Sequence, residues 1–161
     1  MMPASALMTW YADLAHCDYF SFTQPTLRAI GWLERGKPFP TGMVRPEAYE
    51  ALCQMAKQPW EPVTALGWHA CDLCLGEPSV TGFKNLFIPG DGVVYVCPEL
   101  VTHYMCVHRY QPPECFCEAV LKCPPIGSEE YLQALVKNGG HRLIQATRGA
   151  RLGIQTTAAS L

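Results

Sequence analysis

Two short clusters of cysteine and histidine residues have the spacing of a metal site. The first is the stretch HACDLCLG, residues 69–76, in which two residues separate Cys71 from Cys74. This spacing lets both sulfur atoms approach one ion at about 2.3 Å, and the turn between them can direct backbone N–H groups at the thiolates. The second is HYMCVH, residues 103–108. Together the clusters predict a zinc-finger-like site with Zn²⁺ as cofactor.

Helix geometry limits which two residues of the second cluster can bind the same ion. Residues five apart lie roughly 500° around a regular helix, so His103 and His108 can share one ion only if the helix tightens or ends between them. The Pro-Pro pair at 112–113 follows closely and predicts such an end. His103 and Cys106 lie three apart and fit a regular helix more easily. From spacing alone two ligand sets stay open, namely Cys71, Cys74 and His103 with either His108 or Cys106.

The remaining histidines and cysteines near these clusters have simpler interpretations. His69 lies two residues before Cys71, and a contact behind the ligands is favoured over direct binding of the ion. Cys97, at a strand-to-helix junction, is a weaker alternative ligand. Cys115 and Cys117 lie two apart on an expected helix, so their side chains diverge and do not form a redox pair. Burial is the simplest role for the other thiols, Cys17, Cys53 and Cys123.

Signatures of catalysis are missing from the sequence. It contains no Gly-x-Ser-x-Gly, no His-Glu-x-x-His and no phosphate-binding loop. A zinc hydrolase is the alternative if three ligands leave a position open for water, with Asp72, Asp91 or Glu99 as the base. Four good ligands favour a structural ion, so we expect no catalytic residues.

The elements that must position these ligands can be read from turn signals and apolar spacing. NLFIP and VVYVC, separated by Gly-Asp-Gly at 90–92, predict a β-hairpin. A strand is expected over residues 26–34. Helices are expected to begin at Pro46, Pro98, Pro113 and Ser128, the second of them reaching about Arg109. This order predicts an α+β fold with a small antiparallel sheet and about four helices around the metal site.

Length and charge define the domain organisation. The chain has 161 residues, the size of one domain, and a net charge of −2. Lys137, Arg142, Arg148 and Arg151 give the last 25 residues a charge of +4, which leaves residues 1–136 at −6. We expect one domain over 1–138 and a basic, disordered tail over 139–161. Nucleic-acid binding through this tail is a third functional hypothesis, which the acidic body disfavours.

The nine cysteines indicate a reducing compartment. An odd number of cysteines argues against a complete set of disulfides, and the N-terminal residues lack the features of a signal peptide. Apolar runs are too short to cross a membrane. We therefore expect a cytoplasmic protein that makes no membrane contact and whose partner is another protein.

The chain also resembles a family of uncharacterised small bacterial proteins, from about Tyr11 to the segment PPECFCEAV. The shared stretches are GWLERGKPFPTG, GWHACDLC and IPGDGVVYVCPELVTHYMCVHRY. The family pattern has histidine, cysteine and cysteine in the first cluster, and HY followed by a histidine in the second. The resemblance implies His108 rather than Cys106 as the fourth ligand, with Tyr104 as part of the pattern, and it implies no activity. The chain after Cys123 falls outside it.

Overall fold

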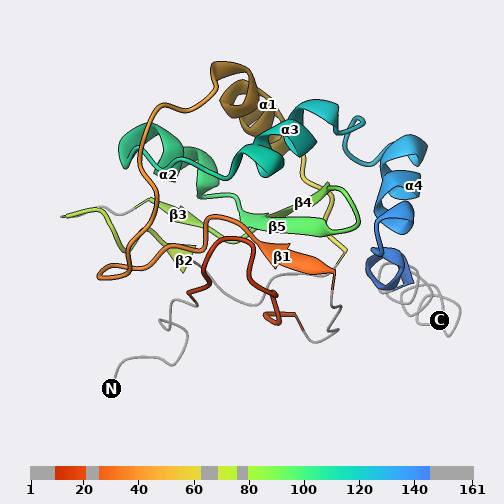
Figure 1. Ribbon diagram of the computed structural model, residues 1–161, viewed down its shortest axis with the longest axis horizontal. Helices are drawn as coiled ribbons and strands as arrows, with labels where there is room; N and C mark the ends of the chain where they lie inside the picture. Colours follow the sequence, from red (N-terminus) through yellow and green to blue (C-terminus); the bar gives the residue numbers. More distant parts are fainter. Residues whose placement is uncertain (1–9, 21–25, 63–68, 76–79, 146–161) are drawn as a thin grey trace, which may run out of the picture.

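The computed structural model describes residues 10–20, 26–62, 69–75 and 80–145. In chain order the elements are β1 (Leu27–Ala29), α1 (Pro46–Lys57), β2 (His69–Ala70), β3 (Thr81–Gly82), β4 (Asn85–Pro89), β5 (Val94–Pro98), α2 (Val101–Val107), α3 (Glu114–Lys122) and α4 (Glu129–Lys137). Figure 1 shows α1, α2 and α3 together on one side of the main sheet, with α4 beside the tip of the β4–β5 hairpin. The predicted α+β class is confirmed.

The β4–β5 hairpin is the centre of the fold, as the sequence predicts. Its strands pair antiparallel, with Phe87 opposite Val96. The turn closes through a hydrogen bond from the Gly90 N–H to the Val93 carbonyl (2.8 Å), and Gly92 has a φ of 74° that favours glycine. Gly90 also lies against the Tyr95 ring, where an added Cβ would come within 2.5 Å.

β1 completes a three-stranded sheet in the order β1-β5-β4. It pairs with β5 in parallel, with Leu27 opposite Val94, so the sheet is mixed rather than purely antiparallel. The strand expected over 26–34 is shorter than predicted. Gly31 has a φ of 71°, which turns the backbone out of the extended conformation soon after Ala29.

The two faces of this sheet carry separate apolar cores, because side chains alternate along a strand. Leu86 and Ile88 of β4 face a core that contains residues of α1, α2 and α3. Phe87, between them, faces the second core. That second core includes Tyr131 and Leu135 of α4 and Cys17 and Trp32 from the segments beside β1.

The helix ends follow local sequence signals. Pro46 begins α1, and the Ser128 hydroxyl accepts a hydrogen bond from the Tyr131 N–H at the start of α4. α2 begins at Val101, later than the predicted start at Pro98. The Glu99 N–H donates to the Lys84 carbonyl (3.0 Å), which extends the β4–β5 ladder past Pro98 and delays the helix.

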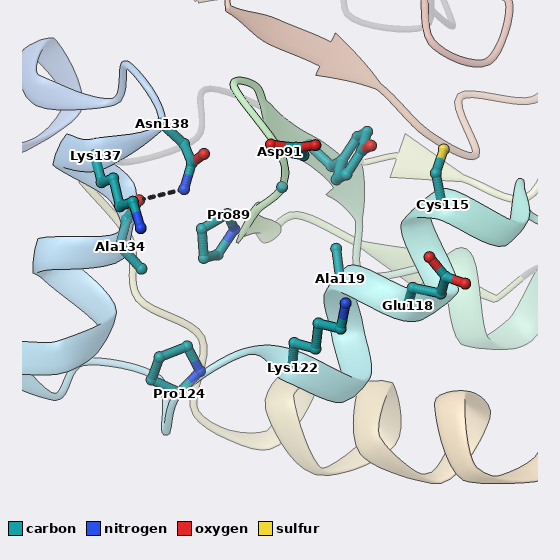
Figure 2. Close-up of a pocket in the computed structure, with 12 residues that line it drawn as sticks. Pro89, Asp91, Cys115, Glu118, Ala119, Lys122, Pro124, Ala134, Lys137 and Asn138 are labelled. Atoms are coloured by element: carbon teal, nitrogen blue, oxygen red, sulfur yellow. Dashed lines mark hydrogen bonds between the residues drawn. The ribbon is translucent and has the colours of Figure 1, made fainter.

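α4 is attached to the hairpin turn by polar contacts as well as by the core. Asn138 accepts a hydrogen bond from the Gly92 N–H (2.8 Å) and donates one to the Ala134 carbonyl (2.8 Å). Figure 2 shows Asn138 and Ala134 facing Pro89 of β4 across a hollow. The hairpin and α4 therefore form the two sides of this hollow.

The segment after α4 is assigned to the tail by sequence, and its first residues contact the domain. Thr26 donates to the Gly139 carbonyl (3.1 Å), and Leu143 is fully buried in the second core. Residues 146–161 lie outside the described residues, so the disorder of the tail stays a prediction.

Within the described part of the chain, every helix is too short or too polar to span a membrane.

Asp13 ties the N-terminal segment to two distant parts of the chain. Its carboxylate accepts hydrogen bonds from the Gly31 N–H (3.0 Å) and from the Tyr110 hydroxyl (2.7 Å). Burial raises the pKa of Asp13 above its ordinary value, and these two hydrogen bonds partly offset the effect. The residue thus joins the turn after β1 to the segment after α2.

Replacing Asp13 with alanine should lower the free energy of unfolding by about 1–3 kcal/mol, because the buried Tyr110 hydroxyl loses its acceptor. Asp18 accepts an exposed hydrogen bond from Tyr11, so Asp18→Ala is the matched control with an expected change within about 0.5 kcal/mol. Urea unfolding measures both. Equal stability of the two variants would show that Asp13 has no such role.

Candidate metal centre

Four side chains from the two sequence clusters meet at one point of the structure. Cys71, Cys74, His103 and His108 each contribute one potential ligand atom, and these atoms all lie within 4.8 Å of one another. The Cys74 sulfur lies 3.3 Å from Nε2 of His103 and 3.5 Å from Nε2 of His108. The Cys71 sulfur lies 3.4 Å from Nε2 of His108. This group could hold a metal ion.

The spacing of these atoms fits a tetrahedral ion. With sulfur at about 2.3 Å and nitrogen at about 2.0–2.1 Å, a tetrahedron places sulfur and nitrogen about 3.6 Å apart. The three sulfur–nitrogen distances are 3.3–3.5 Å, slightly shorter than that value. Both histidines present Nε2, which leaves Nδ1 directed away from the group.

The end of α2 brings the two histidines together. His103 lies within the helix, whereas His108 is the C-cap, with φ of −104° and ψ of 6°. Arg109 then adopts a left-handed φ of 58°, and the Tyr110 N–H returns to the Tyr104 carbonyl (3.0 Å). The helix thus ends at Val107, close to the predicted end at about Arg109, and the five-residue spacing becomes compatible with one ion.

The alternative ligands considered from sequence, Cys106 and Cys97, are not part of the group of four. Cys106 is exposed, and it interacts with Tyr49. Cys97 is fully buried in the core under α2. Tyr104 is buried beside both histidines, with its ring 6.4 Å from that of His108, and it anchors α2 to the core.

His69 is not a member of the group of four. Its Nε2 is 3.3 Å from the Tyr19 hydroxyl, and its ring packs against those of Tyr19 and Trp32. Burial lowers the pKa of His69, which favours the neutral imidazole. The residue therefore packs among aromatic side chains and lies outside the group of four.

Burial also sets the protonation of the ligands themselves. It raises the pKa of the Cys71 thiol and lowers the pKa of His103, where the neighbouring His108 acts in the same direction. Without an ion, both shifts favour neutral side chains. A bound cation would supply the charge that stabilises the thiolate form.

Arg35 holds the turn that carries Cys71 and Cys74. Its backbone N–H donates to the Asp72 carboxylate (2.7 Å), and its Nε donates to the Asp72 carbonyl (2.9 Å). A longer contact of 3.4 Å runs from its Nη2 to the Cys74 carbonyl. The guanidinium thus fixes the backbone between the two sulfurs.

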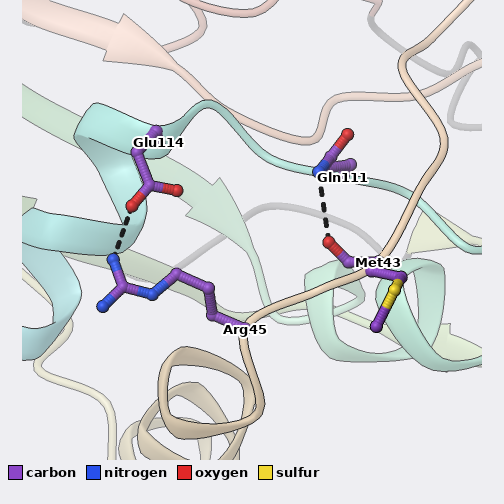
Figure 3. A network of polar contacts seen from close by, with 4 residues as sticks. All are labelled: Met43, Arg45, Gln111 and Glu114. Carbon is purple, nitrogen blue, oxygen red and sulfur yellow. Dashed lines mark hydrogen bonds and ion pairs between the residues drawn. The ribbon is translucent and has the colours of Figure 1, made fainter.

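The loop of residues 35–45, which begins with Arg35, also holds the end of α2. The Gly42 N–H donates to the Arg109 carbonyl (3.0 Å), and the Gln111 N–H donates to the Pro40 carbonyl (2.9 Å). Figure 3 shows two further links nearby, from the Gln111 side chain to the Met43 carbonyl (3.1 Å) and between Arg45 and Glu114. Residues 35–45 therefore position both halves of the cluster.

The β2–β3 pair is attached to the start of α2 by Glu99. One Glu99 carboxylate oxygen accepts a hydrogen bond from the Phe83 N–H (2.8 Å). Gly82 passes so close that an added Cβ would lie 2.5 Å from this oxygen. The Cys71 N–H continues the β2–β3 ladder with a bond to the Val80 carbonyl (2.8 Å).

These positioning residues were not assigned from sequence. The segment GWLERGKPFPTG is conspicuous for its turn residues, but nothing in its composition indicates what Arg35 contacts. Asp72 and Glu99, which are candidate bases in the hydrolase alternative, make structural hydrogen bonds instead. Cys115 is exposed and Cys117 is buried, so the predicted divergence of these thiols is confirmed.

Comparison with known proteins places the chain in a family. The family model described as "Domain of unknown function (DUF7919)" matches residues 9–121, and the chain belongs to this family. Curated proteins and solved structures gave no match. The matched region contains all four residues of the cluster and ends before α4.

Arg35→Gln should weaken the affinity for added Zn²⁺ by about 10–100-fold, because contacts that orient metal ligands typically contribute that much. Lys37→Gln, an exposed neighbour in the same loop, should leave the affinity unchanged. Competition with a colorimetric chelator measures both. An Arg35 variant with unchanged affinity would mean that the Cys71–Cys74 turn is rigid without it.

Arg109 offers a test of the helix end. Arg109→Gly removes the cost of a left-handed side-chain residue and should stabilise the fold by up to about 1 kcal/mol. Arg109→Val should destabilise it by about 1–2 kcal/mol, since a branched side chain is strained at this φ. Thermal unfolding of the two variants is the measurement. A more stable valine variant would contradict this conformation.

Proposed function

We propose that the chain is a zinc-stabilised protein-interaction domain in which Cys71, Cys74, His103 and His108 bind one structural Zn²⁺. The observation that carries the proposal is the meeting of two thiols and two imidazoles within 4.8 Å. This donor set suits zinc, whereas calcium and magnesium prefer oxygen ligands. The ion would join the β2–β3 pair to α2.

A structural role fits this site better than catalysis. Four protein ligands fill a tetrahedral ion and leave no position for water. Two of the three candidate bases, Asp72 and Glu99, are engaged by the Arg35 and Phe83 N–H groups. The third, Asp91, lies at the turn between β4 and β5, among residues of another hollow. These contacts support the structural ion over the hydrolase alternative.

The cellular setting and the partner class belong to the same proposal. A reducing compartment such as the cytoplasm keeps thiols reduced and available as ligands, and the nine cysteines are free thiols in the structure. The nucleic-acid alternative rests largely on Arg148 and Arg151, which lie outside the described residues.

Exposed apolar side chains flank the proposed zinc site and support protein binding. Leu75 follows Cys74 and is 88% exposed, and Val107 precedes His108 and is 57% exposed. Val80 and Phe83, at the two ends of β3, are each 44% exposed, and the Lys84 ammonium lies 5.6 Å from the Phe83 ring centroid. We call these four apolar residues the metal-side surface. Its complement is a protein segment with apolar side chains and an acidic residue opposite Lys84.

Removing a ligand should abolish stoichiometric zinc and strongly lower the melting temperature, because the metal-binding free energy contributes to folding. The variants are Cys71→Ser, Cys74→Ser, His103→Ala and His108→Ala, with Cys106→Ala as the control. Metal analysis and thermal unfolding, each with and without a chelator, are the measurements. Full zinc in His108→Ala with loss in Cys106→Ala would reverse the ligand assignment, and five unchanged variants would refute the metal site.

The metal-side surface can be tested separately from the metal. Leu75→Glu combined with Phe83→Glu should abolish association with a partner identified by reciprocal affinity purification and mass spectrometry, at unchanged zinc content. Val136→Glu on α4 is the control, because Val136 is also 50% exposed but lies on another element. If both variants bind the partner equally well, the metal-side surface is not the binding site. Loss of self-association in sedimentation experiments would identify a second copy as the partner instead.

A further inference from the structure

A second candidate site lies apart from the metal ligands. It is a cleft of about 530 Å³ between the β4–β5 turn, α3 and α4. Figure 2 shows Pro89, Ala119, Pro124 and Ala134 as its apolar walls. This volume falls in the range of sites that hold small molecules. The elements that form it carry none of the four proposed zinc ligands.

Two lysines and a carboxylate border the cleft from different sides. Lys122 is the last residue of α3 and Lys137 is the last residue of α4. In Figure 2 their ammonium groups lie on opposite sides of the hollow, with the Asp91 carboxylate at its upper rim. Among the described residues, ion pairing is found between Arg45 and Glu114, and neither lysine takes part in it. Neither ammonium group is therefore paired with a carboxylate of the described residues.

The framework of the cleft is held in place without a ligand. The Gly92 N–H donates to the Asn138 side chain (2.8 Å), and that side chain donates to the Ala134 carbonyl (2.8 Å). These bonds fix the hairpin turn against the last turn of α4. A preformed cleft loses little conformational entropy on binding, which favours affinity for a small molecule.

The charged side chains that line the cleft indicate which kind of ligand it would bind. Lys122 and Lys137 are balanced by Asp91 and Glu118, so the charged residues of the lining sum to zero. A small dianion would be attracted by the lysines but repelled by the carboxylates. A molecule with both charges can place its carboxylate between the lysines and its ammonium beside Asp91.

We propose that this cleft binds a small zwitterion with one carboxylate and one ammonium group, of the class of free amino acids and dipeptides. Such a site is independent of the proposed zinc ion and of the metal-side surface. It uses α4, which lies beyond the region matched by the family model. Part of the proposed cleft therefore lies outside the region that the family model matches.

The test is titration of the full chain with the twenty L-amino acids and with the dipeptides Gly-Gly, Ala-Ala and Leu-Gly, followed by amide NMR. At least one probe should bind with a Kd of about 1 mM or tighter and shift the amides of residues 89–92, 118–124 and 134–138. Amidation of its carboxylate or acetylation of its amine should each weaken binding by about tenfold or more. Inorganic phosphate should bind more weakly than the zwitterion.

Side-chain variants locate the site. Lys122→Gln, Lys137→Gln and Asp91→Asn should each reduce affinity by about tenfold. Lys57→Gln is the matched control, because Lys57 is likewise an exposed last residue of a helix, α1. Unchanged melting temperatures exclude misfolding as the cause of a loss.

Three results would overturn the proposal. One is that none of the probes shifts these amides at about 10 mM. Another is that the Lys122 and Lys137 variants bind as well as the Lys57 variant. The third is phosphate binding as tight as that of the zwitterion, which would make the cleft a general anion site.

Discussion

The junction between the β2–β3 pair and α2, where four potential metal-ligating atoms lie within 4.8 Å of one another, is the constraint around which this part of the structure is built. The two thiols come from the turn after β2, and the two imidazoles come from α2, almost thirty residues later. A two-residue strand pair such as β2–β3 has too few hydrogen bonds to hold its position alone. Its attachment to α2 must therefore come from side chains, and the cluster lies at that junction.

The loop from Arg35 to Arg45 explains how the junction is built without a large interface. Arg35 donates a hydrogen bond to the backbone between Cys71 and Cys74, while Pro40 and Gly42 hydrogen-bond to the segment after His108. One loop thus limits the relative movement of both ligand pairs. Asp13 reinforces this arrangement, because it accepts hydrogen bonds from the N–H of Gly31, which precedes the loop, and from the hydroxyl of Tyr110, which follows α2. Because the ligands are already close, an ion would lose little of its binding free energy to reorganising the chain.

Local signals predicted much of the fold and the members of the cluster. Turn residues and apolar spacing were sufficient for the β4–β5 hairpin and for α1, α3 and α4, since their ends depend on nearby proline, glycine and serine. Cysteine and histidine spacing indicated the site but left His108 and Cys106 open. The choice between them depends on the left-handed turn at Arg109. The sequence has no glycine there that would indicate a positive φ. The parallel pairing of β1 and the contacts of Arg35 and Asp13 join residues far apart in sequence, so no local pattern reveals them.

Two regions of different chemistry lie at opposite ends of the β4–β5 hairpin. Near β2, β3 and α2, two thiols and two imidazoles converge, and the apolar residues of the metal-side surface lie beside them in the chain. At the tip of the β4–β5 hairpin, lysines and carboxylates face a hollow with apolar walls. Both regions depend on the same two strands, because β5 leads directly into α2 and the turn before β5 forms the rim of the cleft. The hairpin therefore connects the two regions through the chain, and α4 completes the cleft from residues that lie beyond the region matched by the family model.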